Sequence, residues 1–120
     1  PDFAEAWYNC GVTLYHLAQY AEAVDSYDKA VAIKPDYTDA WNNRGVVLND
    51  LGRNAEAVDS YDKAVAIKPD YADAWNNRGV ALDDLGRYAE AVDSYNKAVA
   101  IKPDYTDAWN NREISLKKLN

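Results

Sequence analysis

The sequence predicts an all-α solenoid of seven helices, because one pattern with a period of 34 residues runs through the 120-residue chain. Proline marks this period at Pro1, Pro35, Pro69 and Pro103. Tryptophan repeats it at Trp7, Trp41, Trp75 and Trp109. Within each period the apolar residues follow the spacing of two helices, and no segment alternates as a strand would.

The period divides the chain into three complete repeats and a closing helix. Their bounds are residues 4–37, 38–71, 72–105 and 106–120. The second and third repeats differ at five positions, which fits a recently duplicated array and an engineered, consensus-like array equally well. The first repeat differs from the second at ten positions, all within residues 4–20.

Each repeat is predicted to form a helical hairpin. In the second repeat, apolar and small residues recur at helical spacing from Ala40 to Leu51. Gly52 ends this helix, because glycine readily adopts the left-handed conformation. Pro69 stops the second helix, since proline cannot continue a helix and disfavours helix at the residue before it. The apolar side of that second helix is formed by Ala57, Val58, Tyr61, Ala64, Val65 and Ile67.

Small residues predict close contact between the two helices of a repeat. Gly45 lies one turn after Trp41, and aromatic residues such as Tyr61 are expected to fill the space beside it. The final segment has Glu113 at the position where the repeats have Gly11, Gly45 and Gly79. No second helix follows Glu113 in the sequence, so we expect residues 106–120 to form a solvated capping helix.

These features resemble the tetratricopeptide repeat, a family unit of 34 residues with aromatic, small and proline residues at fixed positions. The matching residues of the second repeat are Trp41, Gly45, Ala57, Tyr61, Ala64 and Pro69. The departures are Arg44 and Arg78 in place of leucine, and Leu48 and Leu82 in place of tyrosine. The resemblance implies a right-handed superhelix whose first helices line a concave groove, and it implies a protein-binding scaffold without catalytic activity.

Asparagines recur on the face of the first helices that the resemblance directs into the groove. One set is in register at Asn9, Asn43, Asn77 and Asn111, and a second pair is Asn42 and Asn76. An asparagine amide both donates and accepts, so the first set is a candidate for holding the backbone of an extended peptide, as in some family members. The alternative is that these asparagines suit a solvated helix face or bond to the neighbouring helix.

The remaining groove positions differ between repeats. The first repeat has Tyr8, Tyr15 and His16 there, which predicts an aromatic subsite. The later repeats have Val46, Val80, Asp50, Asp83 and Asp84, which predicts an acidic subsite. Together with the asparagines these residues form the predicted peptide-binding site, and its acidic part favours a basic peptide. The alternative is drift at exposed positions.

Basic residues are missing where some family members clamp the C-terminal carboxylate of a peptide. The resemblance places that clamp at Tyr8, Val12, Asn43, Asp73 and Asn77. Because none of these is Lys or Arg, we exclude that mode of binding. The arginines Arg44, Arg78 and Arg112 lie beside the apolar stripe instead. We expect their stems to pack and their guanidinium groups to reach a carboxylate or carbonyl, the alternative being contacts with ligand phosphates or carboxylates.

Composition and motifs argue against other classes of protein. A net charge of -7 disfavours nucleic acids and anionic membranes, which bind through Lys and Arg. Cys10 and His16 do not face each other on a helix, and no phosphate-binding loop or Cys/His metal set occurs, so we expect no catalytic residues, no metal and no cofactor. One cysteine, no signal peptide and no membrane-spanning run predict a cytoplasmic protein.

We therefore predict a monomeric, non-catalytic scaffold that binds an extended and basic segment of a partner protein in its groove. The alternative is a structural module that stacks end to end or self-assembles without a groove ligand, either as an engineered unit or as a fragment of a longer array. Binding of basic peptides distinguishes the two.

Overall fold

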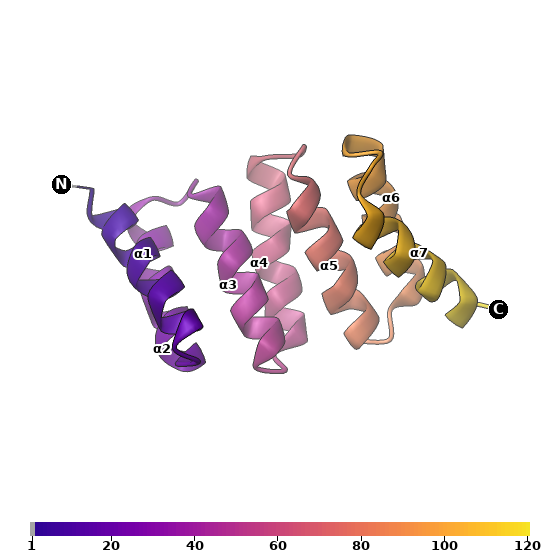
Figure 1. Ribbon diagram of the computed structural model, residues 1–120. Helices are drawn as coiled ribbons and strands as arrows, with labels where there is room; N and C mark the ends of the chain where they lie inside the picture. The colour runs from indigo at the N-terminus through magenta and orange to yellow at the C-terminus, as the bar shows by residue number, and fades with distance from the viewer. Residues whose placement is uncertain (1) are drawn as a thin grey trace.

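The computed structural model describes residues 2–120, which form seven α-helices and no strand. The helices are α1 (Phe3–His16), α2 (Tyr20–Ile33), α3 (Thr38–Asp50), α4 (Asn54–Ile67), α5 (Ala72–Asp84), α6 (Tyr88–Ile101) and α7 (Thr106–Lys118). They form three antiparallel pairs, with α7 after them (Figure 1). The predicted all-α helical-repeat fold is confirmed.

The helices stack in one direction and give an elongated molecule of 50 × 26 × 20 Å. The first helices α3 and α5 each pack on the second helix of their own repeat and on that of the preceding repeat, whereas α1 packs on α2 alone and α7 on α6 alone among the second helices. The first helices of neighbouring repeats meet less extensively. The helices α1, α3, α5 and α7 therefore form one layer, and α2, α4 and α6 form the other (Figure 1).

A tyrosine ring lies over a glycine inside each hairpin. A Cβ atom at Gly45 would lie 2.5 Å from Cε1 of Tyr61. The Tyr61 side chain is only 2% exposed, so the ring has no free space into which it can move. The same contact recurs between Gly11 and Tyr27 and between Gly79 and Tyr95. The missing side chain of glycine therefore allows the close helix contact that the sequence predicted.

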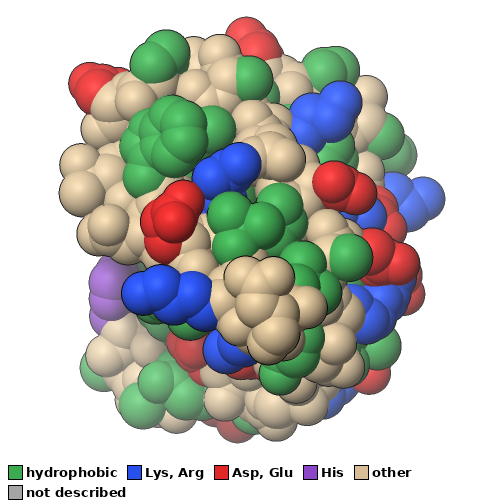
Figure 2. Space-filling view, turned by 90° about the vertical axis from the view of Figure 1, so that its right-hand side faces the viewer, with side chains coloured by type: hydrophobic (Ala, Val, Ile, Leu, Met, Phe, Trp, Pro, Cys, Tyr) green, Lys and Arg blue, Asp and Glu red, His purple; other side chains and the backbone are tan. Residues whose placement is uncertain are grey.

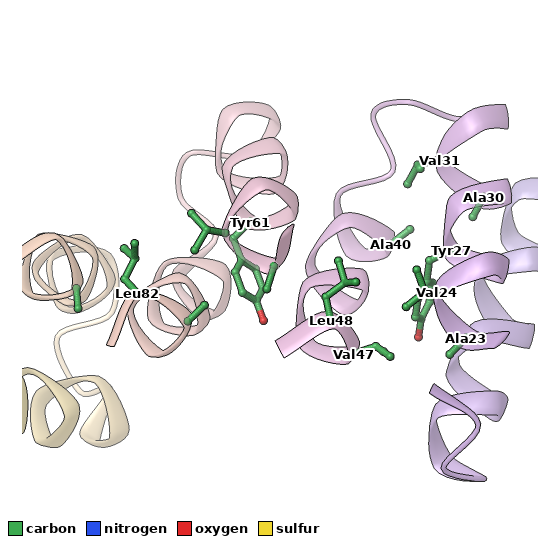
Figure 3. Close-up of a cluster of buried hydrophobic side chains, with 14 of the residues drawn as sticks. Ala23, Val24, Tyr27, Ala30, Val31, Ala40, Val47, Leu48, Tyr61 and Leu82 are labelled. Carbon is green, nitrogen blue, oxygen red and sulfur yellow. The ribbon is translucent and has the colours of Figure 1, made fainter. Parts of the chain in front are cut away.

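Small aliphatic side chains fill the space between successive hairpins (Figure 3). Val47 and Leu48 of α3 are almost fully buried and belong to one cluster with Val24 and Tyr27 of α2. One expectation for the core is wrong, because Ile67 is 38% exposed. It is the last residue of α4 and lies beyond the packed face of that helix.

Tryptophan side chains fasten the connections between repeats. The indole N–H of Trp41 donates to the carbonyl oxygen of Pro35 at 2.8 Å. The same bond joins Trp75 to Pro69 and Trp109 to Pro103. The 34-residue recurrence of both residue types thus has a direct cause, since each tryptophan binds the linker that ends the preceding repeat.

The turn inside each hairpin requires a residue with positive φ. Gly52 has a φ of +77°, and the N–H of Arg53 donates to the carbonyl of Leu48 at 2.9 Å, which closes the end of α3. Gly86 repeats this conformation with a φ of +75°. In the first repeat Ala18 takes this place with a φ of 61°, which is unfavourable for a residue that has a Cβ atom.

Replacing Ala18 by glycine should raise the free energy of unfolding by about 1 kcal/mol, because the steric cost of the left-handed conformation disappears. Gly52→Ala is the matched control and should lower stability by a similar amount. Thermal unfolding followed by circular dichroism checks both variants. Destabilisation by Ala18→Gly would contradict the assigned turn conformation.

The substitution Gly45→Glu should destabilise the protein by about 3 kcal/mol or more, because a charged side chain is forced against the buried Tyr61 ring. Glutamate occurs naturally at the corresponding position of α7, as the exposed Glu113. The reverse substitution Glu113→Gly should therefore cost only about 1 kcal/mol, from helix propensity. Equal thermal midpoints for Gly45→Glu and the wild type would rule out the proposed contact.

Candidate functional site

Two pockets open between the first helices of neighbouring repeats. Pocket A, between α1 and α3, has a volume of about 190 Å³ and is lined by Val12, Tyr15, His16, Tyr27, Asn43, Val46 and Val47. Pocket B, between α3 and α5, has a volume of about 170 Å³ and is lined by Val46, Asn49, Asp50, Tyr61, Asn77 and Val80. Val46 lines both pockets, so the pockets adjoin each other along the layer of first helices.

Polar side chains bridge neighbouring first helices, and several of these bonds join residues that are 35 positions apart. Asn43 donates to the hydroxyl of Tyr8 at 2.9 Å, and Asn77 donates to the amide oxygen of Asn42 at 3.3 Å. Asn111 donates to Asn76 at 3.2 Å. These bonds satisfy polar groups between helices whose backbones make few contacts, and of their residues Asn43 and Asn77 also line the pockets.

Two further bridges of the same separation end on carboxylates. The Tyr15 hydroxyl donates to Asp50 at 2.6 Å, and Asn49 donates to Asp84 at 3.1 Å. The bond to Asp50, together with burial, raises the pKa of Tyr15 to about 12. Tyr15 therefore remains a protonated donor at neutral pH. Each of these bonds uses the Oδ2 oxygen of the carboxylate, which leaves Oδ1 available on Asp50 and Asp84.

Asp83 has a different role from its neighbour Asp84. It accepts hydrogen bonds from the Tyr95 hydroxyl at 2.8 Å and from the Ser115 hydroxyl at 2.7 Å. Ser115 is completely buried, and burial followed by the bond to Asp83 raises the pKa of Tyr95. Asp83 thus joins α5 to α6 and α7, whereas Asp84 is exposed.

Asn42 and Asn76 do not project into the groove as expected. Their side chains are only 6% and 7% exposed. Asn42 donates to the Tyr71 hydroxyl at 3.3 Å, and that hydroxyl donates to Asp39 at 2.9 Å. Tyr71, in the linker between the second and third repeats, therefore covers Asn42. Both asparagines belong to the buried wall, by which we mean the packed surface between neighbouring repeats.

The arginines beside the apolar stripe make the structural contacts that the sequence predicted. Arg44 donates through Nε to Asp28 of α2 and through Nη1 to Ser60 of α4, both at 2.6 Å. Arg78 makes the equivalent contacts with Asp62 and Ser94. Each of these arginines therefore joins the second helices of two repeats. Arg112 donates to Asn96 at 2.6 Å.

The structure brings together one part of the predicted site and separates the rest. The predicted residues that line the pockets are Tyr15, His16, Asn43, Val46, Asp50, Asn77 and Val80. Tyr8 lies in the wall, where its ring stacks on Tyr37 with centroids 5.0 Å apart. Asn9 is exposed in the first helix, and Asn111 lies beyond both pockets.

Sequence reasoning missed the residues that form the floor of each pocket. Tyr27 and Tyr61 come from the second helices and were assigned to the core alone. Their hydroxyl-bearing edges reach between the first helices, because each ring crosses a glycine. These tyrosines recur every 34 residues, as do the valines Val12, Val46 and Val80 of the first helices. This shared period is the sequence signal that could have placed the tyrosines in the pockets.

Residues 2–120 contain no cluster of three or more His, Cys, Asp or Glu side chains with a geometry that could hold a metal. In the same part of the chain, no helix has the length and apolar character that crossing a bilayer requires.

The contrast between the two aspartates can be tested directly. Asp83→Ala should destabilise the protein by about 1–3 kcal/mol, because it removes the acceptor of the Tyr95 hydroxyl and leaves the buried Ser115 hydroxyl only the carbonyl oxygen of Asn111, 3.1 Å away. Asp84→Ala makes the same change one residue later and should alter stability by no more than about 0.5 kcal/mol. Chemical denaturation measures both. Equal effects would contradict the structural role of Asp83.

Comparisons with known proteins agree with this architecture. Models of the tetratricopeptide repeat match residues 4–37, 72–105 and 26–59, and a related repeat model matches residues 47–86. A comparison of the sequence with curated proteins gives no match.

Solved structures share the fold over nearly the whole chain. The first tetratricopeptide domain of Spaghetti, bound to the HSP90 peptide SRMEEVD, has a TM-score of 0.95 at 26% identity, covering 98% of this chain and 93% of that one. The Sgt2 domain from Aspergillus fumigatus has a TM-score of 0.92 at 22% identity, covering 97% and 78%. YrrB, described as having an unusual peptide-binding site, has a TM-score of 0.88 at 26% identity, covering 94% and 58%.

The repeat models cover more than half of the sequence, and the helices, the glycine contacts and the tryptophan bonds recur with the same period. The chain belongs to the tetratricopeptide repeat family.

Proposed function

We propose that this protein is a non-catalytic interaction scaffold that binds an extended segment of a partner protein across pockets A and B. The observation that carries the proposal is the repetition of one kind of pocket between successive first helices. An extended chain that crosses the first helices would meet these pockets in turn. The Spaghetti domain, similar in fold, is bound to a peptide, which supports the same class of ligand here.

Asn43 and Asn77 are suited to contact the backbone of such a segment. Each lines a pocket and donates one hydrogen bond to the preceding repeat. A primary amide has a second N–H and a carbonyl oxygen, which match the acceptor and donor of a peptide unit. The bonds between repeats fix the orientation of both amides and leave this capacity available.

The charge of the surface favours a basic segment. Asp50 lines pocket B and Asp84 is exposed nearby, while no Lys or Arg of residues 2–120 lines either pocket. Lysine or arginine would complement these carboxylates. The HSP90 peptide in the Spaghetti structure contains two glutamates and one aspartate, so this protein would favour a different sequence.

Self-association is the second candidate function, and the surface at the C-terminal end favours it. Trp109, Ile114 and Leu119 are 41%, 52% and 50% exposed. Figure 2 shows hydrophobic side chains at this end among basic and acidic ones. A second copy could cover this surface without using the pockets. Sedimentation that depends on protein concentration, together with no binding of peptides, would favour this function.

Calorimetric titration with a blocked octapeptide of alternating Lys and Ala should give binding that weakens as salt is added, because exposed charges contribute to it. The corresponding Glu peptide should bind more weakly. The double variant Asp50→Asn/Asp84→Asn should lose up to about 30-fold in affinity for the Lys peptide, since each exposed charge contributes about 0–1 kcal/mol. Its binding should also depend less on salt.

The matched control is Asp59→Asn/Asp93→Asn, which makes the same change in net charge at exposed positions of α4 and α6. This control should bind the Lys peptide as the wild type does. If both double variants lose affinity equally, net charge alone explains the binding and the pockets are not its site.

A further inference from the structure

Pocket B corresponds to pocket A one repeat later in the sequence. The residues Val12, Tyr27, Asn43 and Val46 of pocket A correspond to Val46, Tyr61, Asn77 and Val80 of pocket B, each 34 positions later. Two positions at the end of the first helix differ. Pocket A has Tyr15 and His16 where pocket B has Asn49 and Asp50.

We propose that this pair of residues determines which ligand side chain each pocket accepts, so that pocket A takes an apolar side chain and pocket B takes lysine or arginine. The proposal rests on the proposed peptide-binding function and adds a sequence preference to it. Four of the lining positions are the same residue types in both pockets. Val47, which also lines pocket A, corresponds to Ala81, and both side chains are apolar, so the difference in charge preference has to come from the pair at the end of the first helix.

Pocket A offers mainly apolar surface. Valine side chains and tyrosine rings make up five of its seven lining residues, beside His16 and Asn43, and the hydroxyl of Tyr15 is already bonded to Asp50. Its volume of about 190 Å³ lies below the range of about 300–1,000 Å³ typical of sites for drug-sized ligands, so a single side chain is the fitting occupant. A charged ligand group would lose its hydration there without gaining a partner of opposite charge.

Pocket B combines apolar walls with a carboxylate. Val46 and Val80 line it and can pack against the aliphatic stem of lysine or arginine, while the Oδ1 oxygen of Asp50 can accept from the charged head. Asn49 is already committed on both sides, because it donates to Asp84 and accepts from Asn54. Asp50 is therefore the group that distinguishes the charge of the ligand.

The spacing of the pockets sets the spacing of the two ligand residues. Packed helices lie about 8–10 Å apart. An extended chain covers this distance in about three residues. The preferred ligand therefore has an apolar residue and a basic residue about three positions apart.

An exchange of the pair between repeats tests the proposal within the framework of the protein itself. The variant Tyr15→Asn/His16→Asp gives pocket A the pair that pocket B has. The introduced asparagine can donate to Asp50 as Asn49 donates to Asp84, so the bridge between the first helices is kept. The reverse variant, Asn49→Tyr/Asp50→His, gives pocket B the pair of pocket A.

The probes are acetylated and amidated octapeptides of Ala and Ser that carry Leu and Lys, two Lys, or two Leu about three positions apart, with the mixed peptide made in both orders. The wild type should bind one order of the Leu/Lys peptide about tenfold more tightly than the Lys/Lys and Leu/Leu peptides. Tyr15→Asn/His16→Asp should prefer Lys/Lys, and Asn49→Tyr/Asp50→His should prefer Leu/Leu. Fluorescence anisotropy measures the affinity of each protein for each peptide.

Thr38→Ala is the control exchange, because it introduces the residue of the third repeat at a position that lines neither pocket. It should keep the preference of the wild type. If the wild type and both exchange variants bind with one shared preference, the pair does not determine specificity, although peptide binding stands. If no peptide binds the wild type, the proposed function fails and the inference fails with it.

Discussion

The packing of a buried tyrosine ring against a glycine backbone determines how the two helices of each hairpin sit. The ring of Tyr61 occupies the space that a side chain at position 45 would need, and Tyr27 and Tyr95 occupy the corresponding spaces in the other repeats. Because the ring crosses the first helix at this point, its far edge reaches the opposite side of that helix layer. One contact therefore fixes the angle of the hairpin and also supplies the floor of a pocket.

The fold could be predicted from the sequence because its determinants are periodic. The Trp, Gly, Tyr and Pro residues each recur every 34 positions. The glycine–tyrosine contact recurs in all three hairpins, and the tryptophan bond recurs at Trp41, Trp75 and Trp109. The turn was predicted from Gly52, although the sequence did not reveal that Ala18 takes the same positive φ. A periodic framework imposes its backbone conformation on an individual residue even where that residue is poorly suited to it.

The candidate site could be predicted only in part, because its polar residues depend on contacts between repeats. A helical wheel of α3 places Asn42 and Asn43 side by side, but it contains no information on the linker tyrosine Tyr71 that covers Asn42. Asp83 and Asp84 look equivalent in the sequence, and the buried hydroxyl of Ser115, 32 positions later, separates their roles. Periodicity predicts which positions share a face, whereas the partner from the next repeat decides which of them remain accessible.

The bridges between residues 35 positions apart also have a consequence for arrays of different length. Every one of these bridges joins one repeat to the next, and the acceptor Asp50 recurs one period later as Asp84. Excision of residues 38–71 would bring Asp84 to the place of Asp50 opposite Tyr15, and Asn77 to the place of Asn43 opposite Tyr8. The shortened chain would keep a junction between its first two repeats and would keep Tyr15 and His16, the pair of residues that defines pocket A. It would lose pocket B. Lengthening or shortening by whole repeats therefore changes how many ligand side chains are bound without requiring any new contact between the helices.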